Sequence, residues 1–134
     1  MNRLLALVMI LGLAGGLLHA KRTFFPSQAQ QAAALMADPV PPIPPEQVRG
    51  PAVDVYGVAG CGFTRRMLAD LQLAGVPVRY YDLDKPAVET RFNDRFRHAG
   101  VLRAGVYELP IVEVAGKALA RPSSDSIIDR FRTR

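Results

Sequence analysis

After position 50, apolar and polar residues alternate in a pattern that predicts a small α/β domain. Short runs rich in β-branched and aromatic residues, bounded by Gly and Pro, are typical of strands. Longer segments with apolar side chains three and four residues apart are typical of helices. These patterns predict strands over 52–56, 77–83, 110–114 and 118–120, and helices over 63–73, over 87–98, and from a cap at Ser123, Ser124 or Asp125 to the C-terminus.

The predicted elements follow the order βαβαββα. The first two strands are joined by a helix, so they should run parallel through a right-handed crossover. The last two strands are joined by a tight turn at 115–117 and should form an antiparallel hairpin. The expected fold is therefore α/β, a four-stranded mixed sheet flanked by three helices on its two faces. Asp84 is the candidate cap of the second helix, with Pro86 in its first turn.

The first residues of the chain have a different pattern. Residues 4–18 form an uninterrupted apolar run after a short positive start. This run is at the upper length of a signal-peptide core and just short of a membrane span. We expect residues 1–22 to be a cleaved signal peptide or a single membrane anchor; a buried helix of a soluble protein is the remaining alternative. Either of the first two would export the domain to the cell envelope, as a periplasmic or a membrane-anchored protein.

Residues 23–50 are rich in Pro, Gln and Ala, which favours an extended spacer between the leader and the domain. Residues 32–36 could form a short helical turn within it. The alternative is a proline motif that binds another protein. The domain itself is expected to span residues 51–134.

Charge and cysteine content exclude several function classes. The formal charge of the chain is +5, but residues 51–134 mix thirteen Lys or Arg with ten Asp or Glu along their length. Such mixing is typical of a solvated surface and argues against a nucleic-acid partner. The chain has one cysteine, Cys61, so no disulfide can form within it. With His19 and His98 as the only histidines, the roughly four Cys or His ligands of a structural zinc site are missing.

Cys61 is the candidate reactive group because it lies between the first strand and the first helix. Unpaired N–H groups and the positive end of the helix dipole point at a side chain in that position. They favour thiolate over thiol and can bring a thiol pKa from about 8.5 into the range of about 3.5–7.5. Gly60 and Gly62 leave the backbone around the sulfur bare, as a bulky disulfide substrate would require. The alternative is a buried, inert cysteine.

Pro110 is the second unusual position, because a proline at the start of a strand inside a sheet lacks its ladder donor. A cis peptide before it would leave the preceding backbone free to pair with a ligand. The local sequence alone favours an ordinary trans proline at a sheet edge, since cis bonds make up only about 5–6% of X–Pro bonds.

These residues resemble the glutaredoxin family of the thioredoxin-like superfamily. The run Cys61-Gly62-Phe63-Thr64 is similar to the CGFS active site of monothiol glutaredoxins, and Thr64 stands where dithiol members have their second cysteine. The resemblance covers essentially all of residues 51–134. Its further landmarks, in the family's order, are the strand 53–56, the acidic end of the second strand at 80–84, and Glu108-Leu109-Pro110 with the hairpin at 111–117.

The resemblance implies a monothiol thiol–disulfide oxidoreductase with a thioredoxin-like fold. Cys61 would be the catalytic nucleophile that attacks a glutathione mixed disulfide. The backbone of Leu109, before a cis Pro110, would pair with the bound glutathione like an added strand. Glutathione would then resolve Cys61, because the chain has no second thiol, and no resident metal is implied. The implied glutathione-binding residues are Gly62, Phe63, Thr64, Leu109, Pro110 and Asp125.

The chain departs from the family at the usual glutathione contacts. Val58 stands in place of a lysine, and Glu108 in place of a threonine. Ala120-Arg121 stands in place of a Gly-Gly pair, and Asp125 lies one position later than the family's acidic residue. About half of the usual set of glutathione contacts is therefore replaced.

Two other functions are compatible with the same residues. Cys61 and a glutathione thiolate could hold half of an iron–sulfur cluster that is shared across a dimer, as the resemblance to monothiol glutaredoxins allows. The domain could also be a thioredoxin-like interaction module without catalytic activity. The partners would be glutathione or a disulfide-bonded substrate in the enzyme, and another protein in the interaction module.

Overall fold

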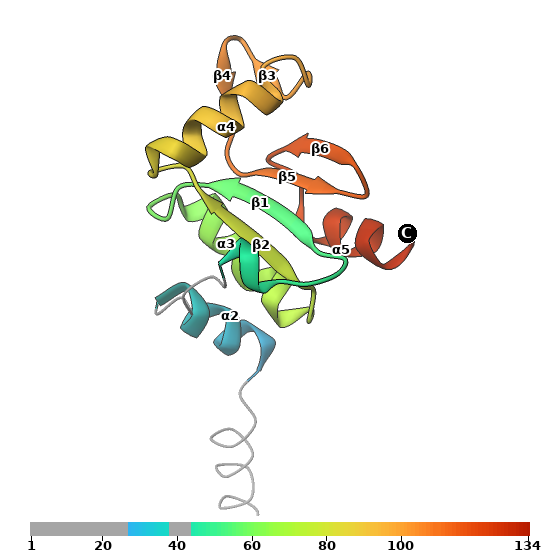
Figure 1. Ribbon diagram of the computed structural model, residues 1–134. Coiled ribbons are helices and arrows are strands. Elements are labelled where there is room, and N and C mark those ends of the chain that lie inside the picture. Colours follow the sequence, from blue (N-terminus) through green and yellow to red (C-terminus); the bar gives the residue numbers. More distant parts are fainter. Residues whose placement is uncertain (1–26, 38–43) are drawn as a thin grey trace, which may run out of the picture.

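The computed structural model describes residues 27–37 and 44–134, drawn as coloured ribbon in Figure 1. The signal peptide or membrane anchor expected over residues 1–22 lies outside the described residues. Among the helices of the described ranges, none combines the length and the apolar character that a membrane crossing requires.

A four-stranded mixed sheet forms the centre of the molecule. Its strands are β1 (Val53–Gly57), β2 (Val78–Asp82), β5 (Ile111–Val114) and β6 (Lys117–Ala120). They lie in the order β2-β1-β5-β6 (Figure 1). β1 is parallel to β2 and antiparallel to β5, and β5 and β6 form the expected antiparallel hairpin. The α/β class, the mixed sheet and the parallel first pair of strands are thereby confirmed.

Helices cover both faces of this sheet (Figure 1). α3 (Gly62–Leu73) and α5 (Ser124–Arg132) lie on one face, and α4 (Pro86–Phe96) lies on the other. The alternation of side chains along β1 explains this arrangement, because successive residues of a strand point to opposite faces. Val53 and Val55 point toward α3 and α5, whereas Tyr56 lies among side chains of the α4 face.

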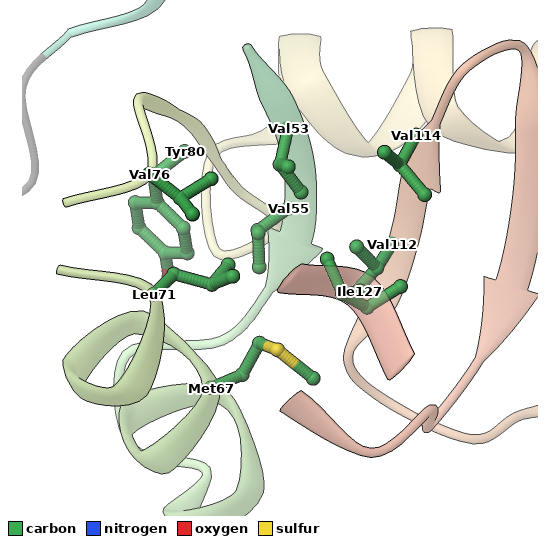
Figure 2. Close-up of a cluster of buried hydrophobic side chains, with 9 residues drawn as sticks. All are labelled: Val53, Val55, Met67, Leu71, Val76, Tyr80, Val112, Val114 and Ile127. Carbon is green, nitrogen blue, oxygen red and sulfur yellow. The ribbon is translucent and has the colours of Figure 1, made fainter. Parts of the chain in front are cut away.

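The larger apolar cluster fills the space between the sheet and the pair α3 and α5. Figure 2 shows Met67 of α3 and Ile127 of α5 pointing toward the valines of the sheet. This cluster fixes both helices against the sheet, and α3 carries Cys61 at its N-cap. Its buried members are Val53, Val55, Met67, Leu71, Val76, Tyr80, Val112, Val114 and Ile127.

The smaller cluster is aromatic and joins α4 to the opposite face. The ring of Tyr56 stacks on Tyr81 at 4.6 Å between centroids and meets the edge of Phe96 at 5.0 Å. Phe92 packs against Phe96 at 5.0 Å and against Tyr107 at 4.7 Å. Such tilted and edge-on pairs are the favoured aromatic geometries, so α4 is held mainly by ring packing.

The start of α4 corrects the expected cap. The helix begins at Pro86 after Lys85, whose side chain makes no capping hydrogen bond, so Asp84 is not the cap. The Asp84 N–H instead donates to Oδ1 of Asp82 at 3.1 Å, which closes a turn at the end of β2. The helix ends at Phe96, two residues before the predicted end.

A small hairpin replaces the plain loop that the sequence predicts before Pro110. It consists of β3 (Leu102–Arg103) and β4 (Val106–Tyr107). Ala104 and Gly105, which join the strands, both have positive φ, 49° and 79°. Positive φ at both turn residues is the property of tight type I′ hairpins, whose twist matches that of the strands.

Parts of the expected spacer lie against the domain. α2 (Gln28–Ala37) is longer than the helical turn predicted at 32–36 and lies beside α3 (Figure 1). The short 3-10 helix η1 (Pro45–Gln47) lies against β2, which is an outer strand of the sheet. Residues 44–47 therefore cover part of a sheet edge.

Candidate functional site

Cys61 occupies the N-cap position of α3, directly after the loop that follows β1. Its backbone is extended (φ −78°, ψ 120°), and its carbonyl accepts the first helical bond, from the Arg65 N–H at 3.0 Å. The Cys61 N–H donates to the Val58 carbonyl at 3.0 Å and closes the turn. The side chain is half-buried and forms no disulfide. The thiol thus lies at the helix N-terminus, as the sequence predicts.

The surroundings of the sulfur favour its ionised form. Burial is the largest single influence, and it raises the pKa of the Cys61 thiol. The N–H and the hydroxyl of Thr64, the N–H of Phe63 and the charge of Arg121 all act in the opposite direction. Together they outweigh burial, so the pKa of Cys61 lies below its ordinary value. A lowered pKa gives more thiolate, which is the nucleophilic form.

Thr64 supplies a hydroxyl directly beside this sulfur. The residue is completely buried, and among the described residues its Oγ1 has no hydrogen-bond partner of ordinary geometry. A buried hydroxyl without a partner is costly, and a thiolate at Cys61 is the acceptor that would satisfy it. The position that holds the second cysteine in dithiol glutaredoxins therefore carries a hydrogen-bond donor in this chain.

Gly57 makes room for Thr64, a role that sequence reasoning missed. A Cβ atom at Gly57 would lie 2.5 Å from Oγ1 and 2.6 Å from Cγ2 of Thr64, too close for either atom. The Gly57 carbonyl also accepts a hydrogen bond from the Tyr80 hydroxyl at 3.1 Å. The sequence signals this role only through the small residues Gly57, Ala59 and Gly60 between the first strand and Cys61, a composition typical of a loop.

Arg121 is the second residue that sequence reasoning missed as a site residue. Its guanidinium lies over the ring of Phe63, 4.4 Å from the centroid, and its Nε donates to the Leu109 carbonyl at 3.2 Å. Its backbone N–H donates to the Pro110 carbonyl at 2.9 Å. This one residue therefore connects the first turn of α3 to the Leu109–Pro110 segment and places a positive charge close to Cys61.

The Leu109–Pro110 peptide is cis, as the resemblance implied. Pro110 is fully buried and Leu109 is half-buried. The Leu109 carbonyl accepts from Arg121, whereas the Leu109 N–H makes no hydrogen bond within the described part of the chain. A carbonyl oxygen has two lone pairs, so one acceptor position and one donor of Leu109 remain for a ligand.

A surface groove of about 1130 Å³ begins at Phe63 and runs between α3 and α5. Three of the six residues implied to bind glutathione, Phe63, Pro110 and Asp125, line it together with Arg121. Phe63 is 59% exposed, and Asp125 lies exposed in the first turn of α5. Of the other three, Thr64 is buried beside the sulfur, Leu109 is half-buried directly before Pro110, and Gly62 is exposed with open space where a side chain would be.

Comparisons of the chain with protein-family models, with curated proteins and with solved structures find no match. Within the described ranges, no three side chains of His, Cys, Asp or Glu are grouped so that they could hold a metal ion.

The departures from the glutaredoxin pattern have identifiable places in the structure. Val58 is half-buried and only closes the turn before Cys61. Glu108 faces the small hairpin, where its carboxylate lies 3.6 Å from Arg103. Of the two arginines on the first turns of α3, Arg66 lies 3.8 Å from Asp70, and the buried Nε of Arg65 has no hydrogen-bond partner in the described part of the chain.

Proposed function

We propose that this chain is a monothiol thiol–disulfide oxidoreductase of the glutaredoxin type, which acts through the Cys61 thiolate. The observation that carries the proposal is the set of donors around the Cys61 sulfur: the N–H groups of Phe63 and Thr64, and the buried hydroxyl of Thr64. Donors that stabilise a thiolate at a helix N-terminus are the requirement of a reactive cysteine. A cysteine with a purely structural role stays protonated and does not need such donors.

The reaction proceeds by two exchanges. The Cys61 thiolate attacks one sulfur of a substrate disulfide; a Cys61–substrate disulfide forms, the original S–S bond breaks, and the other sulfur leaves as a thiolate that takes a proton from water. A second thiolate, for which we propose glutathione, then attacks the mixed disulfide and releases Cys61. For a glutathione mixed disulfide, the net reaction converts the mixed disulfide and one free glutathione into the substrate thiol and glutathione disulfide.

The architecture supports the same assignment. The sheet order β2-β1-β5-β6, the helix after β1 and the buried proline before β5 are compatible with a thioredoxin-like fold. In that arrangement the free N–H and the second carbonyl lone pair of Leu109 are available to an extended ligand. The apolar segment 4–18 is the basis for a further proposal, that the domain works in the cell envelope.

A non-catalytic interaction domain is the second candidate, and one observation favours it. Arg121 replaces a glycine of the glutathione-binding pattern and donates to the Leu109 carbonyl, part of the backbone with which glutathione would pair. Phe63, the largest exposed apolar side chain beside Cys61, would then be a contact for another protein.

Turnover of a small glutathione mixed disulfide, with glutathione as reductant, tests the proposal. The wild-type chain should reduce the mixed disulfide catalytically, and Cys61→Ser should be inactive. A wild-type chain without turnover would overturn the proposed enzyme and favour the interaction domain. A visible absorption band in freshly purified protein, lost in Cys61→Ser, would instead identify the shared iron–sulfur cluster.

A further inference from the structure

Arg121 stands beside the reactive sulfur with its hydrogen-bonding capacity largely unused. Its Nε is bound to the Leu109 carbonyl, but its two terminal NH₂ groups make no hydrogen bond or ion pair within the described residues. An arginine presents its donors as a planar fork that matches a carboxylate. Arg121 lines the groove that begins at Phe63.

The guanidinium is held in place from several sides. The Phe63 ring stacks against it, the Leu109 carbonyl binds its Nε, and the Pro110 carbonyl binds the Arg121 backbone N–H. A group that is already oriented loses less entropy when a ligand binds. Arg121 is therefore prepared for an anion in a way that a freely moving surface side chain is not.

The backbone conformation of Arg121 also indicates a functional role. Its φ is +42°, in the left-handed region that favours glycine, and its side chain is exposed. A positive φ costs free energy in a residue with a Cβ atom. Because the Arg121 side chain is exposed, its burial does little to offset that cost. Non-glycine residues in such conformations cluster at functional sites, where the strain serves a purpose.

Among the cations that line the groove, Arg121 is the one whose charge acts on Cys61. Arg66 lies 3.8 Å from Asp70, whose other contact is the Ser124 hydroxyl at 2.6 Å. Arg132 lines the groove from the last turn of α5, which is about 12 Å along the helix from its first turn. Asp125, in that first turn, would repel an anion from the α5 side and leave the Phe63 side for it.

We propose that Arg121 selects the substrate by binding a carboxylate that lies next to the disulfide attacked by Cys61. The proposal rests on the thiol–disulfide exchange proposed above and names its preferred substrates as disulfides with a carboxylate close to the sulfur. The carboxylate takes no part in the bond changes. Its contact with Arg121 offsets the repulsion that an anionic substrate meets from the attacking thiolate.

The sign of this preference is diagnostic. A thiolate without a neighbouring cation reacts faster with a positively charged disulfide than with a negatively charged one, because opposite charges attract. With Arg121 in place, the order should be reversed. The measured quantity is the ratio of the rate constants for an anionic and a cationic disulfide at one pH, in which the thiolate fraction of Cys61 cancels.

The test uses dithiodiglycolate, hydroxyethyl disulfide and cystamine as anionic, neutral and cationic substrates of the full chain. Arg121→Gly should lower the anionic-to-cationic ratio about tenfold, as expected for the loss of a charge-assisted pair. Arg121→Lys should retain part of the preference, since a lysine keeps the charge but not the fork or the stacking. The control is Arg91→Gln, which removes the same charge from α4 on the opposite face.

Glycine suits the backbone at position 121, so Arg121→Gly should fold with unchanged or higher thermal stability. Arg121→Asn, which also tolerates positive φ, is the second variant and should show the same loss of ratio. Equal ratios in wild type and both variants would overturn the role of Arg121 while leaving the oxidoreductase intact. A Cys61 that reacts with none of the three disulfides would overturn the oxidoreductase itself, and the role of Arg121 with it.

Discussion

The hydroxyl of Thr64 changes its energetic role with the charge on Cys61. While the thiol is protonated, this buried hydroxyl lacks a hydrogen-bond partner of ordinary geometry within the described residues. Once the sulfur ionises, the hydroxyl can donate to it and helps to lower its pKa. A group whose pKa is lowered in the folded protein contributes stability above its unfolded pKa, and this stability is lost as the pH falls through the folded value.

Thr64→Val should therefore change the free energy of unfolding in opposite directions at low and high pH. At a pH below the folded pKa, where Cys61 is a thiol, the variant should be more stable than wild type by about 1 kcal/mol, since a buried unpaired hydroxyl has been removed. At about pH 9, above the folded pKa, it should be less stable, since the thiolate has lost a donor. Urea unfolding at the two pH values measures this crossover.

The same variant tests the activation of Cys61. The rate of alkylation by iodoacetamide should rise with pH to a plateau, with an inflection below about 8.5 in the wild type and at a higher pH in Thr64→Val. Thr64→Ser, which keeps the hydroxyl, is the control and should have the wild-type inflection. A wild-type inflection at or above the value of a free thiol would show that the helix start does not activate the sulfur.

Gly57 provides a second test at the scale of single residues. Gly57→Ala would place a methyl group against both branches of Thr64, so the protein should lose about 1–3 kcal/mol of stability. Thr64→Ala removes both crowded atoms. In a double-mutant cycle measured by urea unfolding, Gly57→Ala should cost much less in the Thr64→Ala background. Additive costs would show that the glycine is required for some other reason.

Among the elements, α5 depends on two serines with different partners. Ser123 is the N-cap, and its Oγ accepts from the Ser126 N–H at a long 3.4 Å. Ser124 donates from its Oγ to Asp70 of α3 at 2.6 Å and so joins the two helices that flank the groove. The short bond to a partly buried carboxylate is the stronger of the two.

Ser124→Ala should therefore destabilise the protein more than Ser123→Ala, although Ser123 is the cap. We expect a loss of about 1.5 kcal/mol for Ser124→Ala. For Ser123→Ala we expect about 0.5 kcal/mol, the lower end of the usual range for a lost cap. Thermal or urea unfolding of the two variants gives the order. The reverse order would mean that the α3–α5 contact contributes little.

The elements that the sequence predicts well are those whose period is set by burial. The apolar positions of β1 and β5 face one of the two clusters, as do Met67, Leu68 and Leu71 of α3, so their spacing follows from burial in the fold. The small hairpin was missed because its strands expose Leu102 and Val106 and its turn uses Ala104 where a glycine or asparagine would have been the signal. The Asp84 cap was wrong because α4 begins after Lys85, and Asp84 lies in the turn that its N–H closes with Oδ1 of Asp82.

The sequence predicts one part of the candidate site and not the other. The position of Cys61 at a helix start could be predicted, because it depends on the order of strand and helix alone. The roles of Arg121 and Gly57 could not, since each depends on contacts between segments distant in sequence: Arg121 with Phe63 and Leu109, and Gly57 with the side chain of Thr64. The sequence could identify Arg121 only as a departure from a family pattern.

At the scale of the whole molecule, the part of the chain that packs on the domain begins before residue 51, the predicted start of the domain. η1 lies against the outer strand β2, and Pro44, Pro45 and Glu46 line a small pocket with Tyr80 and Tyr81. Cover on an outer strand blocks unwanted pairing with other chains. The buried core itself lies between Ala52 and Ile127, so a chain that starts at residue 51 should still unfold cooperatively.

Residues 44–134 should nevertheless be more stable than residues 51–134, by about 1 kcal/mol for the apolar area that the prolines cover. The shorter chain should also aggregate more readily, because β2 is then exposed. Urea unfolding and light scattering of the two truncated chains measure both effects. Equal stability and equal scattering would show that the contact of η1 with β2 is incidental.

Cys61 is the one sulfhydryl of the chain, and it has no internal partner. Any disulfide found on the protein must therefore contain a sulfur from another molecule. Intact mass spectrometry without reductant identifies that molecule: glutathione adds the mass of a tripeptide, a protein substrate adds its own mass, and a second copy doubles the total. The molecule attached to Cys61 in the oxidised protein is thus the one with which the thiol last reacted.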